Sequence, residues 1–134
     1  MPAQHLTTGQ KGEDLAAAWL KEKGMRIVVR NFRCSGGEID LICQDQSTLV
    51  FVEVKTRSTA AYGVPGQAVD RSKARKMVRA AMTYLTQHKA WHRACRFDFV
   101  GIVLLNQEFT VEHWEDVIDV RKALGRSNTS WQPW

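Results

Sequence analysis

Two short apolar segments, residues 37–42 (GEIDLI) and 51–57 (FVEVKTR), carry charged side chains inside patterns that are otherwise typical of buried β-strands. Because successive side chains of a strand point to opposite faces, Glu53, Lys55 and Arg57 share one face of the second segment. A charge in such a strand is costly to bury unless it is paired or binds a metal. The two segments therefore constrain both the fold and the chemistry of the face that carries the charges.

The first segment is expected to alternate in the same way. Alternation predicts that Asp40 shares a face with Glu38 and Ile42, whereas Ile39 and Leu41 point to the other face. Asp40 would then lie on the polar face of its strand.

The short polar stretch between the two segments predicts a β-hairpin. A loop of two or four residues centred between Gln46 and Ser47 places Asp40 directly opposite Glu53. Directly opposed residues share a face, with Cβ atoms roughly 5 Å apart. A loop one residue longer or shorter would put the two carboxylates on opposite faces.

Hydrophobic periodicity predicts the remaining elements of the chain. Gly24 follows the first helix at the position where a left-handed backbone ends a helix. The order helix, three strands, helix, two strands indicates an α/β or α+β domain with a central mixed sheet and flanking helices. The predicted helices span residues 9–23, 67–88 and 117–124, and the predicted strands span residues 25–32, 38–43, 49–55, 96–105 and 109–115.

The first predicted helix carries two neighbouring acids that face different ways. At about 100° per residue, Glu13 falls beside Leu20 at the edge of the apolar stripe, whereas Asp14 projects to solvent. Glu13 is therefore the acid that can face the sheet.

Length and composition are those of an ordinary globular domain. The 134 residues predict one domain over residues 1–124 and a polar C-terminal tail over residues 125–134. No segment approaches the roughly 18 consecutive apolar residues that span a bilayer, and the N-terminus lacks the apolar core of a signal peptide. We therefore expect a cytoplasmic location and no membrane partner. Three cysteines without a Cys-x-x-Cys pair argue against a disulfide framework or a zinc ribbon.

Basic residues gather in the second half of the chain. Residues 71–96 contain eight Lys or Arg side chains and no acid. A stretch of one sign favours either an anionic partner such as nucleic acid or a merely solvated helix face. The candidate nucleic-acid-binding residues are Arg57, Gln67, Arg71, Lys73, Arg75, Lys76 and Arg79.

The paired carboxylates suit metal-assisted cleavage of a phosphodiester. Asp40 and Glu53 offer hard oxygen ligands for Mg²⁺ or Mn²⁺, and the carbonyl oxygen of Val54 could complete the set. Lys55 could orient the attacking water or stabilise the developing oxyanion. Glu13 could hold a second metal or position water.

Each of these candidates also has a purely structural explanation. Glu53 and Lys55 could form an exposed ion pair worth about 0–1 kcal/mol, and Glu13 could be an ordinary acid near a helix start. The basic helix could simply be solvated. Asp98, a charge inside a predicted strand, could approach the active face or pair with an arginine that holds the sheet, and we expect the arginine pair.

An acid on one strand followed by Glu-x-Lys on the next resembles the PD-(D/E)xK nuclease superfamily. Read together, four motifs resemble the bacterial YraN-type family, which is similar to archaeal Holliday junction resolvases. Ile39 stands where the superfamily pattern has a proline. The motifs are residues 11–13 (KGE), 37–42 (GEIDLI), 51–57 (FVEVKTR) and 68–70 (AVD).

The resemblance implies a restriction-endonuclease-like α/β fold and divalent-metal nuclease chemistry. Carried over by position, Asp40, Glu53 and Lys55 form the catalytic core, and Glu13 is the accessory acid. DNA, and branched DNA in particular, is expected by analogy with the resolvases, and the two-fold symmetry of a junction suits a homodimer. The alternative is a non-catalytic nucleic-acid-binding module that keeps the nuclease fold.

Overall fold

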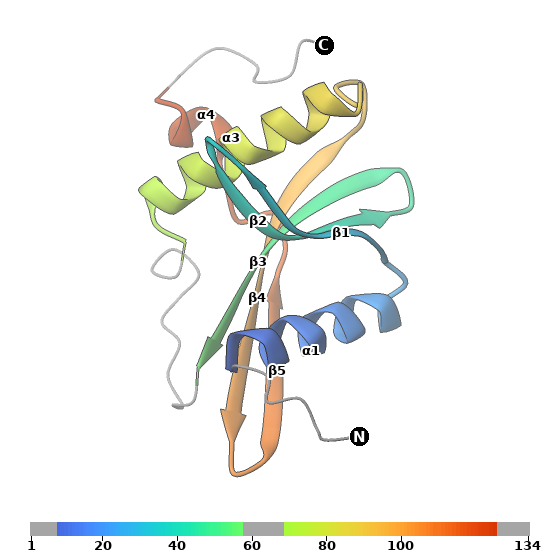
Figure 1. Ribbon diagram of the computed structural model, residues 1–134, viewed down its shortest axis with the longest axis vertical. Coiled ribbons are helices and arrows are strands. Elements are labelled where there is room, and N and C mark those ends of the chain that lie inside the picture. The colour runs from blue at the N-terminus through green and yellow to red at the C-terminus, as the bar shows by residue number, and fades with distance from the viewer. Residues whose placement is uncertain (1–7, 58–68, 126–134) are drawn as a thin grey trace.

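A five-stranded mixed sheet lies between helices in the computed structural model, which describes residues 8–57 and 69–125 (Figure 1). The strands follow the order β1-β2-β3-β4-β5; β3 and β4 are parallel and the other neighbours antiparallel. This is the predicted α/β fold, with the central mixed sheet of a restriction-endonuclease-like architecture. The elements are α1 (Thr8–Glu22), β1 (Arg26–Cys34), β2 (Gly37–Asp45), β3 (Thr48–Arg57), α3 (Arg71–Gln87), β4 (Cys95–Leu105), β5 (Glu108–Trp114) and α4 (Val120–Ala123).

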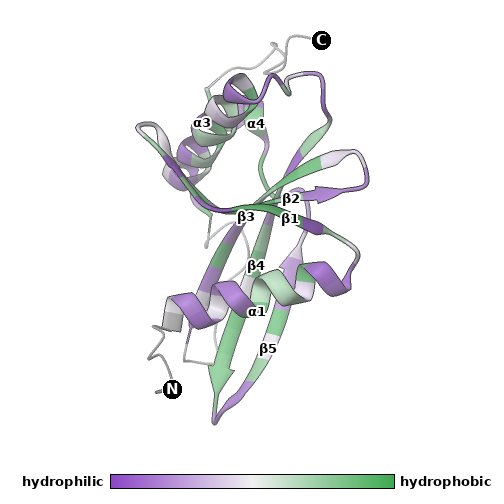
Figure 2. Cartoon of the chain, turned by 45° about the vertical axis from the view of Figure 1, so that its right-hand side comes forward, coloured by the Kyte–Doolittle hydropathy of each residue, from purple (hydrophilic) through white to green (hydrophobic). Residues whose placement is uncertain are grey.

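Two hydrophobic clusters, one on each face of the sheet, position α1 and α3. Alternation along β3 sends Val50 and Val52 into the cluster under α1, and Phe51 into the cluster under α3. Phe51 stacks on Phe97 of β4 with ring centroids 5.3 Å apart. Figure 2 shows the hydrophobic colouring that runs along β4 between the two helices. Because both faces are covered, the central strands can carry apolar side chains on both sides.

The β2–β3 hairpin has the predicted register. Asp45 pairs with Thr48 across a two-residue turn, and the ladder continues as far as Leu41 opposite Val52. Gln46 in the turn has a positive φ of 56°, as expected for the tight turns that suit twisted hairpins. Asp40 and Glu53 are the next residues in this register, immediately beyond the last ladder pair.

Regular alternation fails at one point in β2, and the predicted common face of Ile39 and Leu41 is wrong. Leu41 packs in the cluster under α1, whereas Ile39 packs with Ile42 in the cluster under α3. On the neighbouring strand, Asn31 has a positive φ of 54°. The β1–β2 hairpin therefore kinks beside Asp40, and its tip turns toward α3 (Figure 1).

The tip of the hairpin lies directly against the backbone of α3. A side chain at Gly37, which has a φ of 155°, would overlap the carbonyl group of Lys76. Glycine at this position permits the close approach of the two elements.

The boundaries of two predicted helices are corrected. α3 begins at Arg71 rather than at residue 67, because Asp70 has an extended backbone and its side chain accepts a hydrogen bond from the Lys73 amide at 2.8 Å. The last helix begins at Val120, because the amide of Val117 donates to Phe97 of β4. Gln67, the predicted loop at residues 58–66 and the tail at residues 126–134 lie outside the described residues.

No helix in the described part of the chain has both the length and the apolar character that crossing a membrane requires.

The contact of α1 with β3 predicts an unusual effect of a glycine substitution. A methyl group at the buried Gly12 would overlap the hydroxyl of Thr56. Glycine to alanine in a helix ordinarily stabilises by about 1 kcal/mol, but overpacking costs about 1–3 kcal/mol. We expect Gly12→Ala to lower the free energy of unfolding in urea denaturation. The exposed neighbour change Lys11→Ala should stay within about 0.5 kcal/mol of wild type; a stabilised Gly12→Ala would contradict this packing.

Candidate functional site

Asp40 lies where the β2–β3 ladder stops. Its Oδ2 atom accepts a hydrogen bond of 2.8 Å from the backbone amide of Val54. The side chain thus takes the place of the next ladder partner, because the paired backbone ends at Leu41 opposite Val52. This contact fixes a carboxylate beside the central strand.

Glu53 is a buried acid in the middle of the sheet, with only 4% of its surface exposed. Its Oε1 atom lies 3.0 Å from the ammonium nitrogen of Lys73 on α3. Its Oε2 atom is buried and has no hydrogen-bond partner among the described residues. Burial, and then the charge of Asp40, raises the pKa of Glu53 to about 8, although Lys73 works in the other direction.

Glu13 approaches the same place from α1. Burial, and then the charge of Asp40, raises the pKa of this half-buried carboxyl. The side chain lines a hollow of about 510 Å³ together with Asn31 and Arg30. Its neighbour Asp14 is exposed and pairs with Arg30 at 2.6 Å. The helix therefore turns Glu13 toward Asp40 and Asp14 toward solvent, as the periodicity predicts.

The site thus contains three acids from three elements, Glu13, Asp40 and Glu53, which we call the acid cluster. Lys55 and Arg57 follow Glu53 along β3 and are exposed. The intervening Thr56 faces α1, so both basic residues lie on the opposite face, as predicted. The shared face of Glu53, Lys55 and Arg57 therefore follows the alternation that the sequence of β3 predicts.

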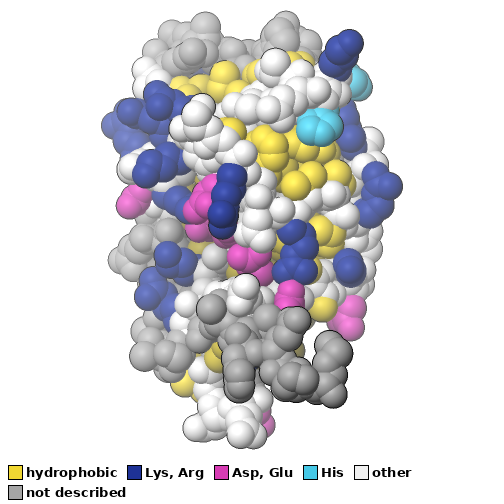
Figure 3. Space-filling view, viewed as in Figure 1, with side chains coloured by type: hydrophobic (Ala, Val, Ile, Leu, Met, Phe, Trp, Pro, Cys, Tyr) yellow, Lys and Arg dark blue, Asp and Glu magenta, His cyan; other side chains and the backbone are white. Residues whose placement is uncertain are grey.

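A groove of about 620 Å³ adjoins the acid cluster between the tip of the β1–β2 hairpin and the start of α3. Its basic side chains are Arg33, Lys73 and Lys76, and its acids are Glu38 and Asp70. Lys73 belongs both to this groove and to the ion pair with Glu53. On the face shown in Figure 3, Lys and Arg side chains flank a small group of acidic ones.

The predicted basic residues of α3 divide between two neighbours. Lys73 and Lys76 line the groove, whereas Arg71 lies in a separate hollow beside α4. Arg75 donates through Nε to the carbonyl of Ala123 at 3.4 Å. The arginine therefore also holds α4, and its loss would change packing as well as charge.

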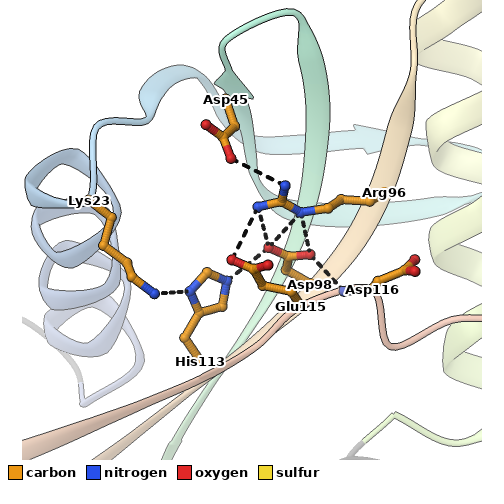
Figure 4. A network of polar contacts seen from close by, with 7 residues as sticks. All are labelled: Lys23, Asp45, Arg96, Asp98, His113, Glu115 and Asp116. Carbon is orange, nitrogen blue, oxygen red and sulfur yellow. Dashed lines mark hydrogen bonds and ion pairs between the residues drawn. The ribbon is translucent and has the colours of Figure 1, made fainter.

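A second polar cluster lies on the α1 side of the sheet (Figure 4). Asp98 of β4 is fully buried and is held 3.1 Å from the Arg96 guanidinium. Its carboxylate also accepts a hydrogen bond from the Asp116 amide at 3.0 Å. Burial alone would raise the pKa of Asp98, but hydrogen bonds from His113, from the Asp116 amide and from Arg96 lower it. The expected pairing of Asp98 with an arginine is confirmed.

The His113 ring completes this cluster. Its Nδ1 atom lies 3.2 Å from the Lys23 ammonium, which can only donate, so Nε2 carries the proton and donates to Asp98 at 2.8 Å. The donor atoms of Asp98, His113 and Glu115 all lie within 4.8 Å of one another. However, the Arg96 guanidinium already supplies positive charge at the Asp98 carboxylate. We assign the cluster a structural role, holding β4, β5 and the segment after β5 together.

The fold and the acid cluster define an α/β domain of restriction-endonuclease-like architecture. The family described as Uncharacterised protein family UPF0102 matches residues 12–102, a span that includes the whole acid cluster and Lys55. The chain belongs to this family, which confirms the family resemblance that its motifs carry.

Three relatives illustrate the match. The chain is 46% identical over 132 residues to a UPF0102 protein of Nitratidesulfovibrio vulgaris (strain DP4), covering 98% of both chains. It is 44% identical over 126 residues to a UPF0102 protein of Lawsonia intracellularis, covering 94% of this chain and 96% of the relative. It is 49% identical over 106 residues to a UPF0102 protein of Geobacter sulfurreducens, covering 78% of this chain and 83% of the relative.

Sequence reasoning missed two features of the site. It placed Lys73 among nucleic-acid-binding residues, whereas the structure pairs it with Glu53. It also passed over Arg33, which lines both the groove and the hollow that contains Glu13. The spacing of Asp70 and Lys73 signals a capped helix start, but no local pattern shows which acid the lysine meets.

The raised pKa of Glu53 predicts how stability changes with pH. Between the ordinary value of 4.5 and about 8, the folded protein keeps a proton on Glu53 that the unfolded chain has released. The free energy of unfolding therefore falls as pH rises through this range. In EDTA, we expect Glu53→Gln to match wild type near pH 5 and to be more stable by roughly 2–4 kcal/mol at pH 8.

Urea denaturation at both pH values measures this difference. Glu38→Gln, which changes an exposed acid, should show no such trend. If wild type is more stable than Glu53→Gln at pH 8, the ionised form of Glu53 does not destabilise the fold and this prediction is wrong.

The Asp98 cluster predicts a large structural effect. Asp98→Asn removes the charge that faces Arg96 and His113, and breaking one partner of a buried pair costs about 3–5 kcal/mol. Glu115→Gln changes an exposed acid 3.6 Å from Arg96 and should cost less than about 1 kcal/mol. Thermal and urea unfolding give both values. Equal, small losses would contradict the structural assignment.

Proposed function

We propose that this protein is a divalent-metal-dependent endonuclease that hydrolyses phosphodiester bonds in nucleic acid. The observation that carries the proposal is the buried carboxylate of Glu53, which keeps one oxygen without a hydrogen-bond partner among the described residues, next to Asp40. A buried carboxylate oxygen is costly to leave unsatisfied. A cation between the two acids would satisfy it.

The donor set fits a hard cation such as Mg²⁺ or Mn²⁺. Asp40 and Glu53 would supply carboxylate oxygens. Glu13 stands close enough to Asp40 that, after burial, the charge of Asp40 raises the pKa of Glu13. Because Val54 directs its amide toward Asp40, its carbonyl faces the same side, as ladder geometry requires. When bound, the ion supplies Lewis-acid chemistry that makes water more acidic and offsets charge on the scissile phosphate.

Lys55 would act on the phosphate side of the acid cluster. It lies two residues beyond Glu53 on the same face of β3 and is exposed. An ammonium there can orient a water molecule or stabilise negative charge that develops on the phosphoryl oxygens.

Nucleic acid would approach along the groove beside α3. Arg33 and Lys76 line it, and the exposed Arg57 lies beyond Lys55 on β3. These side chains can contact successive phosphates without reading bases. DNA, and branched DNA in particular, is proposed by analogy with the resolvases, as is a homodimer that matches the symmetry of a junction.

A non-catalytic nucleic-acid-binding module is the second candidate. The Lys73–Glu53 ion pair favours it, because it compensates part of the buried charge without a metal. The basic groove would serve either function. A cleavage assay distinguishes the endonuclease from the binding module.

The test uses labelled four-way junction, flap, single-stranded and linear duplex DNA with Mg²⁺, Mn²⁺ or EDTA. We expect metal-dependent cleavage that falls by at least about 10²-fold in Asp40→Asn and in Lys55→Ala, because each removes charge stabilisation at the reacting phosphate. Glu38→Gln, a change of an exposed acid in the groove, should keep most of the activity. If wild type and the variants bind the DNA equally and none cleaves it, the endonuclease proposal is wrong and the binding module remains.

A further inference from the structure

Lys73 forms an ion pair that crosses from α3 to the acid cluster. Its ammonium lies 3.0 Å from Oε1 of Glu53, and the lysine side chain is 30% exposed. The lysine is therefore a fixed cation between the groove and the acids.

The position of Lys73 on its helix is unfavourable without such a partner. It stands in the first turn of α3, which contains no acid. The N-terminus of a helix carries partial positive charge, so a cation there costs rather than stabilises. Asp70 caps this turn through the Lys73 amide at 2.8 Å and fixes where the side chain starts. The ion pair with Glu53 offsets the cost.

The two oxygens of the Glu53 carboxylate differ in their partners. Lys73 holds Oε1, whereas Oε2 is buried and has no hydrogen-bond partner among the described residues. An ammonium has only donors, so it cannot itself ligate a cation. It can hold the carboxylate in one orientation, as hydrogen-bonding neighbours do for carboxylates that ligate metals.

We propose that Lys73 is a positioning residue: it anchors Glu53 through Oε1 so that Oε2 stays directed at a divalent cation shared with Asp40. This inference rests on the proposed function, because it assumes that the acid cluster binds such a cation. It assigns to Lys73 a role different from that of the groove lysine Lys76. The alternative role is competition, in which the Lys73 ammonium would occupy the place of the divalent cation.

The experiment measures Mn²⁺ binding to the full chain by titration calorimetry and by the electron paramagnetic resonance signal of free Mn²⁺. Removing a group that orients a metal ligand typically weakens affinity by about 10–100-fold, and we expect this loss in Lys73→Met. Lys76→Met is the matched control, because it removes the same charge from the same helix and groove; it should bind Mn²⁺ as wild type does. Lys73→Arg, which keeps a donor, should recover part of the affinity.

Each outcome bears on a different claim. If Lys73→Met binds Mn²⁺ as tightly as wild type or more tightly, while Asp40→Asn loses binding, the positioning role is overturned and the metal site stands. If wild type does not bind Mn²⁺, the proposed function fails and this inference fails with it. Thermal unfolding in EDTA shows that each variant is folded. Should Lys73→Met be unfolded, Lys73→Ala beside Lys76→Ala decides, because both remove the ammonium, and an unchanged Mn²⁺ affinity in both overturns the role.

Discussion

The burial of Glu53 in the central strand is the constraint on which the site depends. β3 is covered by α1 on one face and by α3 on the other, so a carboxylate here cannot reach bulk water. The ion pair between Lys73 and one oxygen of Glu53 offsets part of the free-energy cost of this burial. Burial, and then the charge of Asp40, raises the pKa of Glu53 to about 8. A sheet without a functional need for this acid would be more stable with an apolar residue.

The same strand places every other part of the site. The β2–β3 ladder ends at Leu41 opposite Val52, which leaves the Val54 amide for the Asp40 carboxylate. Gly12 lets α1 approach Thr56 closely, and this approach brings Glu13 to the acids. The Asp98 cluster lies on the α1 side and ties β4 to β5. The two buried carboxylates thus differ: both oxygens of Asp98 accept hydrogen bonds, whereas Oε2 of Glu53 has no hydrogen-bond partner among the described residues.

Features that depend on local pattern could be predicted from the sequence, and features that depend on tertiary packing could not. Parity along the hairpin predicted that Asp40 meets Glu53, because strand register follows from loop length. The kink beside Asn31 was missed, since one positive φ leaves little trace in an apolar pattern. The partner of Lys73 depends on how α3 crosses the sheet, and helical periodicity does not contain that information.

The central claim is that Asp40 and Glu53 together hold a divalent cation. The most direct test is the anomalous diffraction of crystals grown with Mn²⁺. We predict an anomalous peak between the Asp40 carboxylate, Oε2 of Glu53 and the Val54 carbonyl, with Lys73 still on Oε1. An acid cluster without a peak, or a peak only at Asp98, His113 and Glu115, would contradict the claim.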